Sequence, residues 1–412
     1  MKKNSTKLNS KLAIHGGNPV RTKPWSQGPF HFKEELTALR QVLSGPALAM
    51  ARGPHVNTFR DLVAKTYGAR HVVTTSSGTT AIHVALATAG VEPGDEVIVP
   101  PLTDHGSVIG IFQLNAVPVF CDTIENSLVM DVEKLESVIT KRTKVIMPVH
   151  LAGYPVGMPA LMKIARRHHL KVVEDCAQAH LTKIGNTHVG CFGDFGVFST
   201  NESKHMKTGE GGFILCRSKT DMRYADLFAD KCYPRMGRRK PSTPMFPSLN
   251  VRMSEINAAV AYEQLKRLPA WVKRRNRAGK LIDKTLSRFP LIPHWRPKNA
   301  YCSYWQSLFS IDTSQTNATA RKLVKLLNAE GIPCARRPAS FLPDWEIFNK
   351  LNDDPKCFAT YQPGILKKGY YPVGICPIAK KAVENTMAIV VNQHTTDSQV
   401  RDLELALAKI FG

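Results

Sequence analysis

The sequence predicts an α/β protein: a large three-layer domain with a mainly parallel sheet, and a smaller C-terminal α+β domain. Two observations predict this class. Between about residues 71 and 218, short apolar runs rich in β-branched residues alternate with stretches of helical periodicity. Runs that are apolar on both faces are typical of parallel strands covered by helices on both sides. After residue 290 the segments become shorter and mixed, which indicates the second unit.

The chain of 412 residues is long enough for both units. Residues 1–30, rich in Lys, Gly and Pro, predict an irregular N-terminal arm. We assign residues 31–265 to the large domain and residues 266–412 to the small one. A long helical pattern begins at Ser254, and Pro269 within it predicts a kink or a boundary.

Seven apolar runs are the expected strands of the large sheet. They are HVVTT (71–75), EVIVP (96–100), VPVFCD (117–122), KVIMPVH (144–150), KVVED (171–175), GVFST (196–200) and GFILC (212–216). Helical stretches precede them at 32–43 and 56–67 and lie between them at 79–90 and 158–170. Ligands of such sheets gather at the carboxyl ends of the strands, so the residues that follow these runs are the candidate site.

The charge of the chain predicts an anionic partner. Lys and Arg number 56 against 33 Asp and Glu, a formal charge of +23. A phosphorylated substrate, a membrane surface or nucleic acid would each fit this excess. The basic clusters at 236–240, 272–277 and 335–337 are short and scattered, which disfavours a nucleic-acid partner.

The nine cysteines include no Cys-x-x-Cys pair, so neither a disulfide scaffold nor a metal site is expected. The basic N-terminus lacks the apolar core of a signal peptide. The most apolar stretch is interrupted by Pro100 and Pro101, which argues against a membrane span. We therefore expect a cytoplasmic protein.

Three short segments at strand ends carry candidate chemistry. Residues 76–80, Ser-Ser-Gly-Thr-Thr, open a helix and could hold an anion, or could simply cap the helix. Asp175 ends an apolar strand. It could be a buried carboxylate that needs a cationic partner, or it could simply cap a helix. Lys204 follows a strand that ends at Ser199 and precedes a Gly-Glu-Gly-Gly turn. It could be a nucleophile or an exposed loop lysine.

Together the three segments place an anion cradle, a carboxylate and a lysine at one edge of the sheet. Pyridoxal 5'-phosphate (PLP) has a phosphate, a basic ring nitrogen and an aldehyde that would use all three. Lys204 would form the Schiff base, and Asp175 would keep the ring nitrogen protonated so that the ring acts as an electron sink.

Several blocks in order resemble the DegT/DnrJ/EryC1/StrS sugar aminotransferases, which belong to the aspartate aminotransferase (fold type I) superfamily. The blocks include SSGTTAIHVAL, PGDEVIVP, PVHLAGYPVGM, VVEDCAQAH, GDFGVFS, the Lys204 segment with GEGG, and LNVRMSEINAAVAYEQLKRL. The similarity runs from about Gly17 to the C-terminus. It implies that the large domain has the fold of a PLP-dependent transferase of fold type I.

The resemblance also implies residue roles. Lys204 and Asp175 would be catalytic, and Gln178 would lie near the ring hydroxyl. The phosphate would be held by Gly78, Thr79 and Ser199. Asn250 would reach the phosphate of the neighbouring subunit's cofactor, which implies a homodimer with shared active sites.

One segment departs from the family pattern. After the strand at 96–100 the family usually carries Thr and an aromatic residue that stacks on the cofactor ring, whereas this chain has Thr103-Asp104-His105. Asp104 cannot stack. Either His105 covers the ring, or the site is built differently and His105 is a loop histidine without a role.

The predicted function is PLP-dependent transfer of an amino group from glutamate or glutamine to a keto-sugar. A nucleotide-linked keto-sugar is favoured slightly over a keto-cyclitol of the scyllo-inosose type. One alternative is a PLP-dependent sugar dehydratase, in which the resemblance implies histidine in place of the lysine. Another is a non-catalytic basic regulator that binds nucleic acid. The presence of Lys204 favours transamination.

Overall fold

The computed structural model describes residues 11–25, 28–45, 47–50, 53–233, 244–337, 341–354 and 364–412. Its large sheet has seven strands in the order β1-β9-β8-β5-β4-β2-β3. Their bounds are β1 His71–Thr75, β2 Glu96–Val99, β3 Val117–Phe120, β4 Thr143–Ile146, β5 Lys171–Asp175, β8 Phe195–Ser199 and β9 Gly212–Cys216. Only β9 runs antiparallel to its two neighbours, β8 and β1. The predicted mainly parallel sheet and its seven strands are confirmed.

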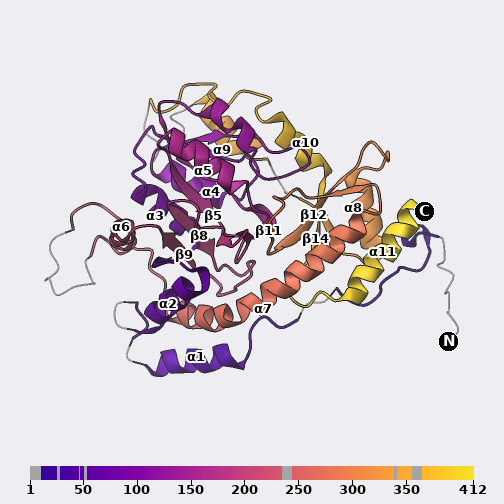
Figure 1. Ribbon diagram of the computed structural model, residues 1–412, viewed down its shortest axis with the longest axis horizontal. Coiled ribbons are helices and arrows are strands. Elements are labelled where there is room, and N and C mark those ends of the chain that lie inside the picture. Colours follow the sequence, from indigo (N-terminus) through magenta and orange to yellow (C-terminus); the bar gives the residue numbers. More distant parts are fainter. Residues whose placement is uncertain are drawn as a thin grey trace.

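Helices cover both faces of this sheet (Figure 1). They are α1 Lys33–Ser44, α2 His55–Tyr67, α3 Gly78–Thr88, α4 Gly106–Gln113, α5 Met158–Arg167, α6 Lys219–Ala229 and α7 Glu255–Leu286. Helix α3 packs against α4 and α6 over one face. Helices α2 and α7 pack together over the other and close a second apolar core with residues of β1, β8 and β9. The sheet is therefore the middle of three layers.

Helix α7 continues through Pro269, so this proline is not a helix boundary. Leu265 and Leu268 before the proline, and Trp271 and Val272 after it, are all buried in the second core. This apolar packing on both sides outweighs the hydrogen bond that proline cannot donate. The predicted division after residue 265 falls inside this one helix.

The C-terminal part forms a four-stranded antiparallel sheet, as expected for a small α+β unit. Its order is β10 (Leu291–Pro293), β12 (Gln306–Ile311), β14 (Thr386–Val390) and β13 (Cys334–Arg336). The helices of this part are α8 Ala320–Ala329, α9 Glu346–Asp353, α10 Pro377–Asn385 and α11 Asp397–Phe411. A small third sheet joins β11 (Ala300–Tyr301), β6 (Lys183–Ile184) and β7 (Thr187–His188). Short 3-10 helices lie at η1 Ala13–His15, η2 Val132–Val138, η3 Leu151–Gly153 and η4 Leu342–Asp344.

The described part of the N-terminal arm lies against the C-terminal unit. The Glu330 carboxylate accepts hydrogen bonds from the backbone N–H groups of Ala13 and Val20 and pairs with Lys409. The side chains of Glu330 and Lys409 are only 1% and 2% exposed. The arm is thus anchored to α8 and α11 by a buried, fully paired charge.

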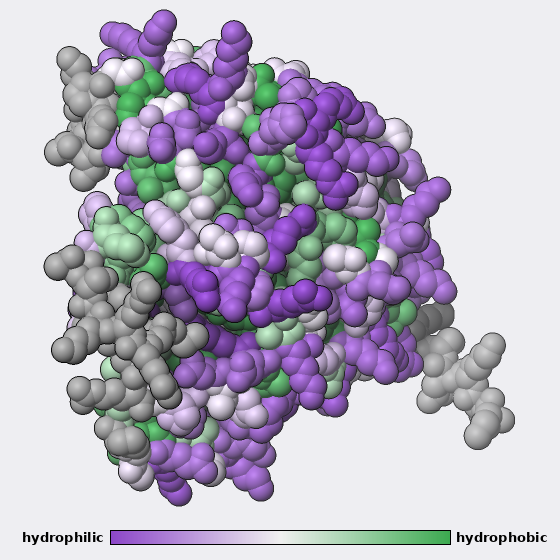
Figure 2. All heavy atoms as spheres, turned by 60° about the vertical axis from the view of Figure 1, so that its left-hand side comes forward, coloured by the Kyte–Doolittle hydropathy of each residue, from purple (hydrophilic) through white to green (hydrophobic). Residues whose placement is uncertain are grey.

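The basic cluster at 272–277 is not a continuous exposed surface. In the cluster at 272–277, Arg275 is buried and donates to the carbonyls of Tyr304 and Val391. The cluster at 236–240 lies outside the described residues. Hydrophilic side chains spread over most of the face seen in Figure 2, with apolar residues between them. Among the described residues, no helix is both long and apolar enough to span a membrane.

Candidate active site

A pocket of about 350 Å³ lies where the parallel strands of the large sheet end. Strand β5 is the central strand, and Asp175, its last residue, is only 4% exposed. The pocket brings together six of the eight predicted site residues: Gly78, Thr79, Asp175, Gln178, Ser199 and Lys204. Its other lining residues are Ser77, Ile82, Thr103, Asp104, Gly106, Ser107, Val149, Ala177, Asn201, Ser203 and Glu210.

The start of α3 forms an anion cradle in this pocket. Ser77 caps the helix by accepting a hydrogen bond from the Thr80 N–H, and its carbonyl accepts the Ala81 N–H. The N–H groups of Gly78 and Thr79 therefore stay available, and both residues line the pocket. A Cβ on Gly78 would lie 2.7 Å from the Ser199 Cβ. Only glycine lets β8 and the helix start approach this closely.

The Asp175 carboxylate is held by two donors. The Ser107 hydroxyl donates to Oδ2 at 2.7 Å, and the Ala177 N–H donates to Oδ1 at 3.0 Å. Ser107 is itself 2.7 Å from the Thr103 hydroxyl, which makes a buried chain of three side chains. Burial raises the pKa of Asp175, while the two hydrogen bonds and Lys204 oppose the rise. A cation opposite Asp175 would stabilise its charge further.

Lys204 lies in the loop between β8 and β9 and lines the same pocket. The loop is fixed by the Trp305 indole, which donates to the Ser203 carbonyl at 2.6 Å, and the Lys204 Nζ lies 5.2 Å from the Trp305 ring centre. Burial lowers the pKa of Lys204, and the charges of Asp175 and Asp104 oppose this. A lysine with a lowered pKa carries the neutral amine that attacks a carbonyl more readily than an exposed lysine does.

These three features fit PLP. The cradle at Gly78 and Thr79 suits its phosphate, the amine of Lys204 suits its aldehyde, and the buried carboxylate of Asp175 suits its ring nitrogen. Gln178 accepts a hydrogen bond from the Ala152 N–H at 2.8 Å, which leaves its amide N–H groups for a ligand oxygen.

Two predicted site residues are not brought into the pocket. The His105 ring lies 5.1 Å from the ring of Trp345, and His105 is not among the residues that line the pocket. Asn250 is exposed, in a bridge with Asp230, and Arg252 of the same block forms an ion pair with Asp230.

Sequence reasoning missed Ser107, Thr103 and Trp305. Ser107 follows Thr103 by four residues and sits in the first turn of α4, so both hydroxyls can meet. The departure of residues 103–105 from the family pattern was the one feature of the sequence that could have drawn attention to these hydroxyls. Trp305 lies about 100 residues from Lys204 in sequence, and only the tertiary fold brings them together.

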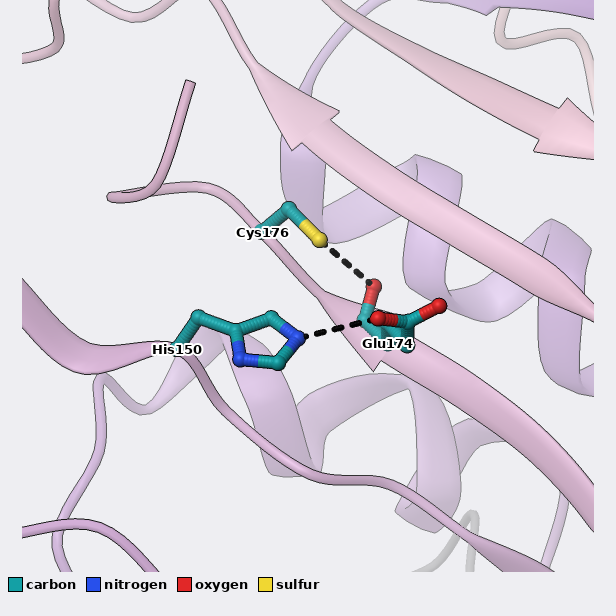
Figure 3. A group of neighbouring side chains, drawn as sticks. All are labelled: His150, Glu174 and Cys176. Atoms are coloured by element: carbon teal, nitrogen blue, oxygen red, sulfur yellow. Dashed lines mark hydrogen bonds and ion pairs between the residues drawn. The ribbon is translucent and has the colours of Figure 1, made fainter. Parts of the chain in front are cut away.

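Behind the pocket, His150, Glu174 and Cys176 are close enough to suggest a metal site (Figure 3). The Glu174 carboxylate accepts three backbone N–H groups, those of residues 190, 192 and 193. It also pairs with the His150 Nε2 at 3.1 Å, while the His150 Nδ1 accepts the Val156 N–H. His150 is thus neutral with its proton on Nε2, and Cys176 donates to the Glu174 carbonyl. The cluster is a hydrogen-bonded brace in which both Glu174 oxygens and both His150 nitrogens already have partners.

A second pocket of about 170 Å³ opens beside the first and shares Thr103, Asp104 and Gln178 with it. Its remaining lining is Leu128, Leu151, Ala152, Trp305, Gln306, Leu308, Arg337 and Trp345. These residues come from the large sheet's loops, from β12 and from the segment around η4 and α9. The site is therefore built jointly by the two parts of the chain.

Comparisons with known proteins agree with this geometry. The model of the DegT/DnrJ/EryC1/StrS aminotransferase family matches residues 30–339. The L-glutamine:2-deoxy-scyllo-inosose aminotransferase of Streptomyces kanamyceticus is 34% identical over 343 residues, 79% of this chain and 80% of that protein. The protein of the same name from Streptomyces lividus is 37% identical over 295 residues, covering 68% and 69% of the two chains.

The crystal structure of an aminotransferase from Psychrobacter cryohalolentis superposes with a TM-score of 0.83 at 25% identity, covering 94% of this chain and 99% of that one. The half-buried Lys204, the Asp175 carboxylate and the anion cradle thus lie in a fold that this chain shares with a known aminotransferase. The chain belongs to the DegT/DnrJ/EryC1/StrS family and is a PLP-dependent aminotransferase.

Proposed function

We propose that this aminotransferase moves the amino group of glutamine to a keto-cyclitol. The observation that carries the proposal is the second pocket, a small space lined by two half-buried indoles, of which that of Trp305 lies 5.2 Å from the Lys204 Nζ. Its 170 Å³ is below the range of about 300–1,000 Å³ typical of pockets for larger ligands, and a single polyol ring suits such a volume. The names of the relatives at 34% and 37% identity support the same class of ketone.

In this mechanism PLP, when bound, supplies the electron sink that stabilises negative charge on the substrate carbon. Asp175, fixed by Ser107 and Ala177, holds the proton at the ring nitrogen. The Lys204 amine acts as the base that takes the proton from the α-carbon of the donor, and in the second half-reaction as the acid that gives a proton to the former carbonyl carbon of the acceptor. Gly78 and Thr79 hold the phosphate through their N–H groups.

We also propose a homodimer in which Asn250 serves the partner's site. Asn250 is exposed and lies next to Arg252, whose ion pair with Asp230 fixes the backbone of this block. An exposed asparagine on a braced segment is free to contact a second subunit. Size-exclusion chromatography with light scattering tests this, and Asn250→Ala should weaken cofactor retention without unfolding the chain.

The experiment for the proposed reaction uses the purified holoenzyme. Addition of glutamine, without a ketone, should convert the Schiff-base absorbance to that of the aminated cofactor, and a keto-cyclitol should restore it. Lys204→Ala should abolish the absorbance band and turnover. Restoration by a nucleotide-linked keto-sugar and not by the cyclitol would overturn the cyclitol assignment.

A nucleotide-linked keto-sugar, favoured by the sequence analysis, is the second candidate. The excess of 23 positive charges supports it, because a diphosphate would be attracted to such a surface. The dehydratase alternative has less support, since Lys204 is present and its amine lines the pocket.

A further inference from the structure

Lys204 is carried by the loop between β8 and β9, so the position of its amine depends on how firmly that loop is held. At the base of the loop, the Thr200 N–H donates to the Gly211 carbonyl and the Thr208 N–H donates to the Thr200 carbonyl, both at 2.9 Å. The Lys204 N–H closes a local turn with the Asn201 carbonyl. These bonds close the loop on itself, so its place relative to the pocket depends on contacts with other elements.

Helix α7 supplies such a contact through Gln264, which is fully buried. The Gln264 Oε1 accepts the Lys207 N–H at 2.8 Å, and the Gln264 Nε2 donates to the Lys207 carbonyl at 3.1 Å. One side-chain amide thus holds both backbone groups of a residue that lies three positions after Lys204. Because the amide is buried, water does not readily replace either bond, and the clamp is costly to open.

A second side chain of the same helix holds the next part of the loop. Asn257 precedes Gln264 by seven residues, about two turns, and therefore lies on the same face of α7. Its Nδ2 donates to the carbonyls of Thr208 at 2.7 Å and Glu210 at 2.9 Å. Since α7 is packed in the second apolar core, the loop after Lys204 is mounted on a rigid support.

The N-terminal arm reaches the same clamp. The Gln264 Nε2 lies 3.2 Å from the Phe30 carbonyl and 3.1 Å from the His31 Nδ1. The Lys207 Nζ lies 3.9 Å from the centre of the Phe30 ring, close enough for a cation–π contact. With the Lys207 carbonyl, three acceptors surround the two N–H groups of this amide. Gln264 therefore serves the protein's own backbone and not a ligand.

The residues between the clamp and the lysine leave little room for adjustment. His205 is 1% exposed and Met206 is fully buried. A closely packed segment transmits a shift at one end to the other. We propose that Gln264 is a positioning residue of the aminotransferase: by fixing Lys207 on α7, it sets where the Lys204 amine points in the pocket. This role does not depend on which ketone the enzyme accepts.

The first test follows cofactor loading and not turnover. PLP is added to the cofactor-free protein, and the absorbance of the Schiff base is followed as the Lys204 amine condenses with the aldehyde and releases water. Gln264→Leu, which removes the amide at similar size, should slow this step by about 10- to 100-fold because the amine is displaced.

A second ligand separates positioning from general damage to the site. Pyridoxine 5'-phosphate has an alcohol in place of the aldehyde, so it cannot react with Lys204. Its dissociation constant in Gln264→Leu should stay within about twofold of the wild type, because Gly78, Thr79 and Asp175 are unchanged. Weakening of this ligand in proportion to the slower loading would overturn the proposal, since it would report a distorted pocket.

The matched control is Gln399→Leu. Gln399 is 2% exposed, its Oε1 accepts the Thr396 N–H at 2.8 Å in the first turn of α11, and it does not line the pocket. The loading rate of this variant should stay within about twofold of the wild type. Equal slowing in the Gln264 and Gln399 variants would contradict a specific role, because it would report the loss of any buried amide.

Gln264→Glu keeps the size of the side chain and tests the clamp if the leucine variant does not fold. A carboxylate can still accept the Lys207 N–H, but its second oxygen would face the carbonyls of Lys207 and Phe30. Loading should therefore be slower in this variant too, with pyridoxine 5'-phosphate again bound normally. Loading at the wild-type rate would show that only the volume at position 264 matters, and the proposal would fail.

Hydrogen exchange in the cofactor-free protein measures the loop directly. The amides of residues 204–209 should exchange faster in Gln264→Leu than in the wild type, and at the wild-type rate in Gln399→Leu. If exchange in this segment rose while the loading rate stayed the same, Gln264 would hold the loop without positioning the lysine. Unchanged exchange would equally overturn the proposal, because the clamp would then not restrain the loop.

Discussion

The hydroxyl of Ser107 should control the charge of Asp175. It donates to the Asp175 Oδ2 at 2.7 Å and contacts the Thr103 hydroxyl at the same distance. All three side chains are buried, so water does not readily replace a lost donor. Ser107→Ala removes one of the two hydrogen bonds that oppose the effect of burial on the pKa of Asp175.

The size of the effect follows from the charge of the acceptor. A hydrogen bond to an ionised group contributes about 1.5–3 kcal/mol, and a neutral one about 0.5–1.5 kcal/mol. Loss of the charged bond disfavours the ionised carboxylate, so it should raise the pKa of Asp175 further. Thr103→Val, which removes only the outer neutral bond, should cost about 0.5–1.5 kcal/mol.

The assay is urea unfolding of the cofactor-free protein at pH 7 for Ser107→Ala, Asp175→Asn and the double variant. The coupling free energy should be about 1–2 kcal/mol, the difference between a charged and a neutral acceptor. The dissociation constant of PLP should rise in Ser107→Ala as well. If Ser107→Ala cost the same in the wild type as in the Asp175→Asn variant, the reasoning would be refuted, because the contribution of the hydroxyl would then not depend on the charge.

Three further outcomes are expected. Lys204→Met should stabilise the cofactor-free protein at pH 7, because burial lowers the pKa of Lys204 and folding therefore disfavours its charged form. Urea unfolding should show that this gain in unfolding free energy shrinks as the pH approaches the ordinary lysine pKa of about 10.4. A gain that stays constant with pH would contradict this. Gly78→Ala should lower the unfolding free energy by about 1–3 kcal/mol, because the new Cβ would lie 2.7 Å from the Ser199 Cβ. It should also weaken phosphate-dependent cofactor binding, measured by equilibrium dialysis. Unchanged cofactor retention would count against the cradle. Glu174→Gln should lower the unfolding free energy by at least about 1.5–3 kcal/mol, because three backbone N–H groups lose a charged acceptor. Zinc or a chelator should not shift the Tm of the wild type, and stabilisation by zinc would restore the metal interpretation.

The large sheet was predictable because each of its strands has a local signal. The runs at 71–75, 171–175 and 212–216 coincide with β1, β5 and β9, since strands that are covered on both faces of a sheet need continuous apolar sequence. The segment from α9 to β14 was not delimited, because its apolar residues follow no regular strand or helix period and pack against distant parts of the chain. The Tyr371 hydroxyl, for example, donates to the Pro118 carbonyl of β3.

The candidate site likewise has a part that the sequence predicts and a part that only the tertiary structure shows. Lys204, Asp175 and Gly78 stand at strand ends, which the topology forces onto one edge, so their meeting could be inferred from order alone. The second pocket is lined in addition by residues from a different part of the chain, Trp305, Trp345 and Arg337. Their local sequence does not indicate that they line a pocket. For His105 the sequence left two roles open, a contact with the cofactor ring or no role, and the structure places its ring 5.1 Å from that of Trp345.

Strand β5 ends in two acids with opposite fates: Glu174 satisfies the protein's own amides behind the sheet, and Asp175 faces the pocket. Their separation depends only on the two-residue alternation of a strand. A one-residue insertion or deletion in β5 would exchange them. The longer acid would then crowd the space meant for a flat ring, and the shorter one could not reach three amides. The register of β5 and the chemistry of the site therefore depend on each other, and a change in one would alter the other.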